Sequence, residues 1–328
     1  MEIIGRQIEF GVATEAVRSV AESSADKWMR KVTANIVERA EHALDDTTRG
    51  RLEDGEGRRV VQKFVEGDLE GVLHADVLGW FLSNVYGVVV SSNVVGSVYS
   101  HVFTLGQNIQ HPSLTLFAKD GSVQQLTFAN SMISTLEMSV AIDELVRFTV
   151  SFIGGVAADD TDTPSYDTEY DFIARDVEVK IADSEGGLAG ATATKAKDLS
   201  ITWDQGLIRD HVVGSYDPDD IYNAKLMIEG ELTLNFADEA LKDLYLSDDA
   251  KYMSITIQGA ADIGSGNNPT ITILLNKVQF MDWNREGAAN ELSTETVTFQ
   301  AFYNPADTQQ SQVTLQNLTS SYVNVPSS

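Results

Sequence analysis

The sequence contains no cysteine in 328 residues and has few basic side chains. Without cysteine the chain can form no disulfide and has no thiolate chemistry, so an intracellular place of synthesis is the simpler expectation. Lysine and arginine together number 23 against 49 acids, which gives a formal net charge of −26. Binding to nucleic acid by phosphate neutralisation, and to an anionic membrane surface, both require clustered basic residues. The charge therefore argues against both partners.

Long apolar runs are also missing. No stretch approaches the ~20 apolar residues that a membrane-spanning helix needs. The first ten residues include Glu2, Arg6 and Glu9 and have no apolar centre, so they do not resemble a secretory signal. We therefore expect synthesis in a cytoplasm and no membrane partner.

The motifs of common enzyme and cofactor sites are absent. No Gly-x-Ser-x-Gly turn and no Gly-x-x-x-x-Gly-Lys phosphate loop is present. The histidines lie outside the spacing of a zinc pair: His42, His74, His101, His111 and His211. Among 49 acids chance carboxylate pairs are inevitable, so their number alone does not indicate a glycosidase. We expect no catalytic residue, no cofactor and no metal.

One short motif occurs twice. Residues 65–73 read Val-Glu-Gly-Asp-Leu-Glu-Gly-Val-Leu, and residues 228–236 read Ile-Glu-Gly-Glu-Leu-Thr-Leu-Asn-Phe. Both begin apolar, Glu, Gly, acidic, Leu, and both alternate with a period of two, which predicts a strand with one buried face. The other face carries acids without an intervening lysine: Glu66, Asp68, Glu70, Glu229 and Glu231. Like charges so close repel one another, so we expect this face to have a function.

Similar elements surround both copies. A helix is predicted after each copy, at 75–86 before Gly87 and at 238–246. Each copy also follows a predicted strand, at 27–39 and 199–203, and each half closes with a pair of long alternating runs. Between strand and motif the first half has a charged, glycine-bearing loop at 45–57, and such long loops are often functional.

This order predicts a mainly β protein made of two tandem β-sandwich units, each with one flanking helix and a long loop. The expected boundaries are 1–155 for the first unit, 156–171 for an acidic linker, 172–303 for the second unit and 304–328 for a polar C-terminal tail. Identity between the halves is low, so the prediction of a duplication depends on the order of the motifs. Two sandwich domains with generic patterning are the alternative.

The pattern resembles the tail tube, or major tail, proteins of phages with long, non-contractile tails. The resemblance covers most of 1–155 and, more weakly, 190–303. It depends on the opening stretch 4–11, the motif at 65–69, the helix 75–86 and the closing strand pair 129–153, taken in that order. None of these is a signature alone.

The resemblance implies a structural virion protein whose subunits form rings around a channel. Hairpins from every subunit would join into one closed β-barrel, and rings would stack through the long loop, so DNA crosses the channel only in transit. It also implies tape measure, tail terminator and baseplate proteins as partners, and assembly in the cytoplasm of a host bacterium. The acidic strands are then predicted to face the channel, and the loop residues to lie between rings: Asp45, Arg49, Arg51, Glu53 and Asp54.

Two units per chain depart from the simplest family pattern of one unit. Three chains would then make a pseudo-six-fold ring, so we expect a homotrimer, with a homohexamer as the alternative. Two other functions stay open. One is a carbohydrate-binding or glycoside-cleaving β-sandwich with an acidic cleft, in which Trp28, Trp80, Trp203 and Trp283 could stack on sugars. The other is a related ring protein, such as a tail terminator, a baseplate hub or a secretion tube.

Overall fold

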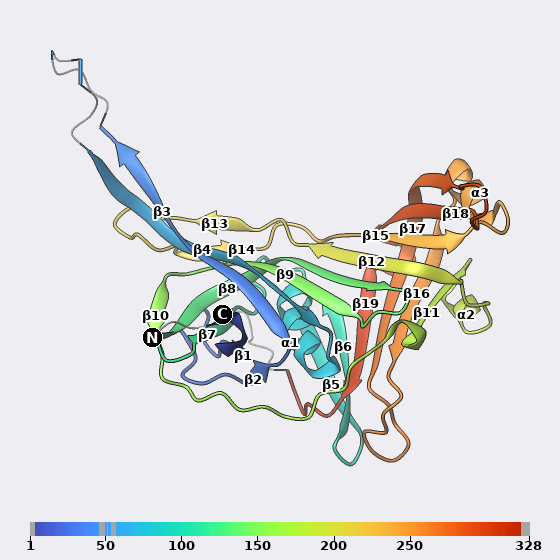
Figure 1. Ribbon diagram of the computed structural model, residues 1–328, viewed down its shortest axis with the longest axis horizontal. Coiled ribbons are helices and arrows are strands. Elements are labelled where there is room, and N and C mark those ends of the chain that lie inside the picture. Colours follow the sequence, from blue (N-terminus) through green and yellow to red (C-terminus); the bar gives the residue numbers. More distant parts are fainter. Residues whose placement is uncertain (1–3, 46–49, 51, 54–56, 323–328) are drawn as a thin grey trace.

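The chain is built mainly of antiparallel strands (Figure 1). The computed structural model describes all residues except 1–3, 46–49, 51, 54–56 and 323–328. In the first half the strands are β1 (Ile8–Thr14), β2 (Lys27–Met29), β3 (Val32–Leu44), β4 (Arg58–Val72), β5 (Gly87–Val95), β6 (Val98–Leu105), β7 (Leu114–Asp120), β8 (Gln124–Ala141), β9 (Arg147–Gly154) and β10 (Ala157–Asp159).

The second half is also built mainly of antiparallel strands. Its strands are β11 (Val177–Ala182), β12 (Ala196–Asp204), β13 (Ile208–Asp210), β14 (Asp220–Tyr222), β15 (Met227–Asn235), β16 (Lys251–Gln258), β17 (Thr270–Glu286), β18 (Thr294–Ala301) and β19 (Ser311–Asn317). The helices are α1 (Ala75–Tyr86), α2 (Glu185–Leu188) and α3 (Ala240–Ser247), with two 3-10 turns, η1 (Gly5–Gln7) and η2 (Ala174–Asp176). The predicted mainly β fold is confirmed.

Eight strands form one main sheet that runs through both halves. Their order is β3-β4-β9-β8-β12-β15-β18-β17, and every neighbouring pair is antiparallel. The two halves meet inside this sheet, where β8 of the first half pairs with β12 of the second over seven residue pairs. In the described part of the chain this sheet does not close on itself.

A second layer covers the buried face of the main sheet. It has the order β5-β6-β19-β17-β16-β11, and a smaller group β2-β1-β7-β8-β10 lies beside it. The long strands β8 and β17 take part in both layers. The first part of β8 pairs with β10 and its last part with β12 of the main sheet. The first part of β17 pairs with β16 and its last part with β18 of the main sheet. Between the layers lies one hydrophobic core that draws on both halves, as expected for a β-sandwich.

The helix α1 has the predicted bounds, 75–86, and lies within this core. Eleven of its twelve residues are buried, which suits a helix that is apolar on almost every side. Gly87 ends it with a left-handed backbone at φ 79°, a conformation that glycine adopts without a steric penalty. The helix α3 differs: it has no buried residue, and its partly buried Leu241, Leu244 and Tyr245 pack against the core beside β17.

The polar tail contains a strand that the sequence analysis did not predict. Residues 311–317 form β19, which pairs with β17 of the second half and with β6 of the first. Beyond it the Tyr322 ring is 1% exposed and packs edge-on against Trp80 of α1 at a centroid distance of 5.0 Å. The tail therefore ties the two halves together a second time.

The two halves repeat the same strand pairing, residue by residue. Gly67 lies opposite Phe152, which lies opposite Ile133, and a bulge follows in β8. In the second half Gly230 lies opposite Phe299, which lies opposite Phe280, and a bulge follows at the same step in β17. The strands β3, β4, β9 and β8 thus correspond in order and register to β12, β15, β18 and β17.

This correspondence explains the glycine in the repeated motif. A Cβ atom on Gly67 would lie 2.5 Å from the Asn35 carbonyl oxygen, and one on Gly230 would lie 2.5 Å from the Ser200 carbonyl oxygen. In both copies the ring of the opposing phenylalanine occupies the remaining space. Glycine is therefore needed so that an aromatic ring can lie across the strand.

We predict that Gly230→Ala lowers the free energy of unfolding by about 1–3 kcal/mol, because the new methyl group overpacks a fixed carbonyl and a buried ring. Thermal or urea unfolding measures this change. The matched control is Gly186→Ala, whose Cβ would meet no atom within 4 Å. Equal stability of the two variants would contradict the proposed reason for the glycine.

Candidate functional site, an acidic face of the main sheet

All five acids of the two motif copies lie on the same face of the main sheet. Three are on β4 and two on β15, with β9, β8 and β12 between them. Residues directly opposite in neighbouring strands point to the same side of a sheet. One such row crosses five strands and joins the two copies: Glu70, Thr149, Glu137, Thr202 and Glu229. We call this side of the sheet the acidic face.

The reverse side of the same strands forms the core. Leu69 of β4 and Leu232 of β15 are 2% and 0% exposed, whereas Asp68 and Glu231, one position before each, are exposed. The alternation predicted from the sequence therefore holds in both copies. Six more acids share the acidic face, and the sequence analysis did not single them out: Glu41, Glu137, Asp198, Asp204, Asp282 and Glu286.

Little positive charge compensates these acids. In the first copy Arg39 Nε lies 2.7 Å from Glu66 Oε1, and Arg147 Nη1 lies 3.6 Å from Glu70 Oε1. All four side chains are at least 40% exposed, so each pair contributes at most about 1 kcal/mol. Among the described residues no basic group pairs with Glu229 or Glu231. The acidic face thus keeps a negative potential.

At one edge of this sheet a two-stranded arm leaves the body (Figure 1). β9 accompanies β4 only from Val65 to Val72, and beyond that point β3 and β4 continue as a ribbon. Every residue of β3 from 38 to 44 is exposed. Isolated two-stranded ribbons have marginal stability in water. Between Arg58 and Phe64, β4 has β3 as its only ladder partner among the described strands.

The predicted inter-ring loop lies at the end of this arm. Asp45 and Glu53 are described and exposed, whereas Arg49, Arg51 and Asp54 lie outside the described residues. Two apolar side chains are exposed in the same region: Leu44 is 74% exposed and Leu52 is 106% exposed.

A ribbon from the second half supports the base of the arm. The strands β13 and β14 pair with each other, and the segment between them runs beside β4 (Figure 1). Lys63 donates its backbone N–H to the Tyr216 carbonyl oxygen at 2.7 Å. The Arg209 guanidinium lies 3.7 Å from the centre of the Phe64 ring, a cation–π contact.

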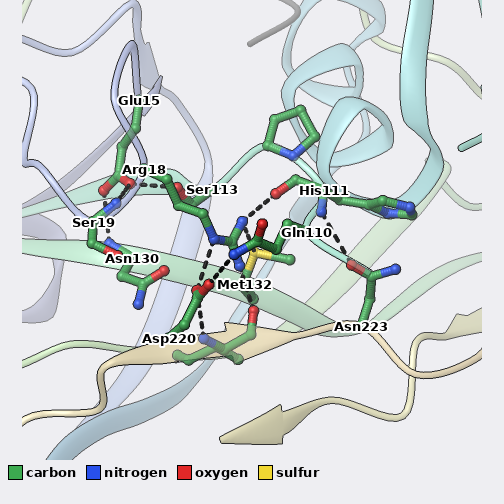
Figure 2. Close-up of polar contacts among 12 residues, drawn as sticks. Glu15, Arg18, Ser19, Gln110, His111, Ser113, Asn130, Met132, Asp220 and Asn223 are labelled. Atoms are coloured by element: carbon green, nitrogen blue, oxygen red, sulfur yellow. Dashed lines mark hydrogen bonds and ion pairs between the residues drawn. The ribbon is translucent and has the colours of Figure 1, made fainter. Parts of the chain in front are cut away.

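Figure 2 shows the polar cluster that joins this ribbon to the first half. Arg18 Nε lies 2.7 Å from Asp220 Oδ1, and the same guanidinium donates to the carbonyl oxygens of His111 and Ile221. Gln110 Nε2 donates to Asp220 Oδ2 at 2.6 Å. Both charged groups are largely buried, so the loss of either one would leave the other without compensation.

Two further groups of this cluster have shifted pKa values. Burial raises the pKa of Glu15, although its carboxylate accepts hydrogen bonds from the backbone N–H groups of Ser19 and Asn130. Burial also lowers the pKa of His111 and so favours its neutral form. The hydrogen bonds of the cluster hold the backbone of His111, Ile221, Ser19 and Asn130, so the cluster positions the segments that contain these residues. The sequence analysis missed it because Arg18 and Asp220 lie 202 positions apart and share no local pattern.

The described residues contain no group of three or more histidines and acids that could hold a metal ion. None of the described helices is long and apolar enough to cross a membrane. Trp28, Trp80 and Trp203 are at most 5% exposed. They cannot stack on a sugar.

The fold and the site combine a two-faced β-sheet with an acidic surface, an extended arm and a core shared by two similar halves. A family model described as phage tail tube protein matches residues 5–301. The match covers nearly the whole chain, so the protein belongs to the phage tail tube protein family and is a structural component of the virion tail. No curated protein matches the chain.

Proposed function

We propose that this protein assembles into stacked rings that form the tail tube, and that its acidic face lines the channel through which genomic DNA leaves. The observation that carries the proposal is the placement of both motif copies on one exposed face of one sheet. The apolar side of this sheet packs against the core, so only the acidic side is free to face a channel. Rings of such sheets would turn the same face to the channel in every subunit.

The negative charge of the acidic face would keep DNA from binding to the channel wall. Duplex DNA carries one negative charge per ~1.7 Å of its axis. A wall of the same sign offers no phosphate-binding site, so DNA slides past it without adhering. At ~0.15 M salt the repulsion extends about 8 Å from the wall, which is enough to keep phosphates out of direct contact. DNA is therefore cargo in transit.

The paired halves support a ring of three chains. We infer that the chain is a tandem duplication, with units at 1–155 and 172–303, a linker at 156–171 and a tail at 304–328 that locks the units together. Each unit provides four equivalent strands to the main sheet. Three copies would close a barrel of twenty-four strands, eight from each, with pseudo-six-fold symmetry.

The remaining partners follow from the place of the tube in a tail. A tape measure protein would occupy the channel before DNA does, and tail terminator and baseplate proteins would bind the two ends. The arm formed by β3 and β4 would reach the next ring, so residues 45–57 would lie between rings. Assembly would take place in the cytoplasm of the host bacterium.

We predict that replacing Glu66, Asp68, Glu70, Glu229 and Glu231 with lysine slows DNA ejection, because DNA phosphates would bind the wall. The monomer should still fold, since all five positions are at least partly exposed. Ejection from particles carrying the variant, followed by a DNA-binding dye, measures the rate at several salt concentrations.

A control variant carries five acid-to-lysine changes on exposed residues away from the acidic face, at Asp183, Glu185, Glu239, Asp243 and Asp249. It has the same net charge. Ejection rates equal to those of the control would mean that the acidic face does not line the channel.

We also predict that deleting residues 45–57 and joining the two strands by a short turn prevents stacking but not folding. The deleted residues lie beyond the last β3–β4 pair, Leu44 and Arg58, so no described strand pairing is lost. Electron microscopy measures tube length, and circular dichroism checks the fold. Tubes of normal length and yield would contradict an inter-ring role.

A further inference from the structure

Both edges of the main sheet are open strands. β3 pairs with β4 on one side, and in the described part of the chain it has no partner strand on the other. At the opposite edge, residues 282–286 of β17 pair with β18 and likewise have no second partner strand there. Open edges with free N–H and C=O groups invite pairing with another chain, and proteins normally protect them.

The structure already contains the contact that would close these edges. β3 corresponds to β12, and β17 corresponds to β8, by the strand order and register described above. Within the chain β8 and β12 pair antiparallel, with Met138 opposite Ile201 and Thr135 opposite Asp204. Within one chain β8 and β12 join the two halves, whereas their counterparts β17 and β3 form the two open edges of the sheet.

We propose that β17 of one copy pairs with β3 of a second copy in the register of the β8–β12 ladder. The correspondence fixes each pair. Ile36 takes the place of Ile201 and Arg285 that of Met138, so these two lie opposite each other. The expected neighbours are then Asn35 with Glu286, Ile36 with Arg285, Val37 with Asn284, Glu38 with Trp283, and Arg39 with Asp282.

Burial supports this pairing. Ile36 and Ala34 are only partly covered, whereas their counterparts Ile201 and Leu199 are 1% and 6% exposed because β8 lies beside them. Trp283 is also partly covered, and its counterpart Leu136 is 0% exposed. A second copy in this register would cover the side chains of Ala34, Ile36 and Trp283, which a single chain leaves partly exposed.

Charge supports the same register. Arg39 would lie directly opposite Asp282 on the acidic face, where the internal ladder has Thr135 and Asp204 instead. On the reverse side Glu38 would lie diagonal to Arg285 and within reach of an ion pair. A shift by one residue would move Arg39 away from Asp282 and turn apolar side chains to the channel. The second copy is therefore specified by complementary charges as well as by hydrogen bonds.

This inference rests on the proposed ring assembly, and cysteine cross-linking tests both. The chain has no cysteine of its own, so Val37→Cys with Asn284→Cys introduces a single possible pair. Six strands separate β3 from β17 within one chain, so a disulfide between the two positions must join two chains. Direct neighbours in an antiparallel ladder lie about 4.5–5.5 Å apart at Cα, which a disulfide can bridge.

After oxidation of sedimented tubes, we expect loss of the monomer band on a non-reducing gel and the appearance of dimers and closed trimers. The control is Thr33→Cys with Asn284→Cys, which is four residues out of register, about 13 Å, and should stay monomeric. Tubes that form but give no more cross-link than this control would overturn the register and leave the tube function standing. Cross-linked soluble chains without tubes would support the edge pairing and refute the tube. Neither tubes nor cross-links would refute both.

Discussion

The antiparallel ladder between β8 and β12 is the contact on which the rest of the structure depends. It makes one sheet of the two halves, and it places the acids of β4 and β15 on a common face. Its reverse side is tightly buried: Trp203 is 0% exposed and its indole N–H donates to the Tyr86 hydroxyl at 2.9 Å. Burial raises the pKa of Tyr86 to about 12, so this hydroxyl stays neutral and can donate in turn to Ser311 of the tail. One ladder therefore links the acidic face, the core and the C-terminal strand.

Local pattern was sufficient for much of the fold. Because side chains alternate along a strand, the sequence of 65–73 and 228–236 was enough to predict which residues of β4 and β15 are exposed and which are buried. The helix 75–86 was predicted with its bounds, because an apolar run before a glycine marks both the helix and its end. Correspondence between the halves was visible in the Glu-Gly-acidic-Leu motif even though few residues are identical.

Features that depend on distant segments could not be predicted in this way. The sequence does not show which strands are neighbours, so the row from Glu70 to Glu229 and the role of Glu137 in it emerge only from the sheet. The reason for Gly230 is a phenylalanine on another strand. Residues 311–317 look like a tail because their composition is polar, yet β19 is held by ladders to strands of both halves. Tertiary pairing overrides composition in each case.

The central claim is that two equivalent units in each chain build a channel with an acidic wall. Electron cryomicroscopy of assembled tubes, averaged without imposed symmetry, tests it most directly. The account predicts three chains in each ring, six similar four-strand groups around the channel, and Glu70, Glu137 and Glu229 turned toward its axis. Six chains in each ring, or an acidic face on the outer surface of the tube, would contradict it.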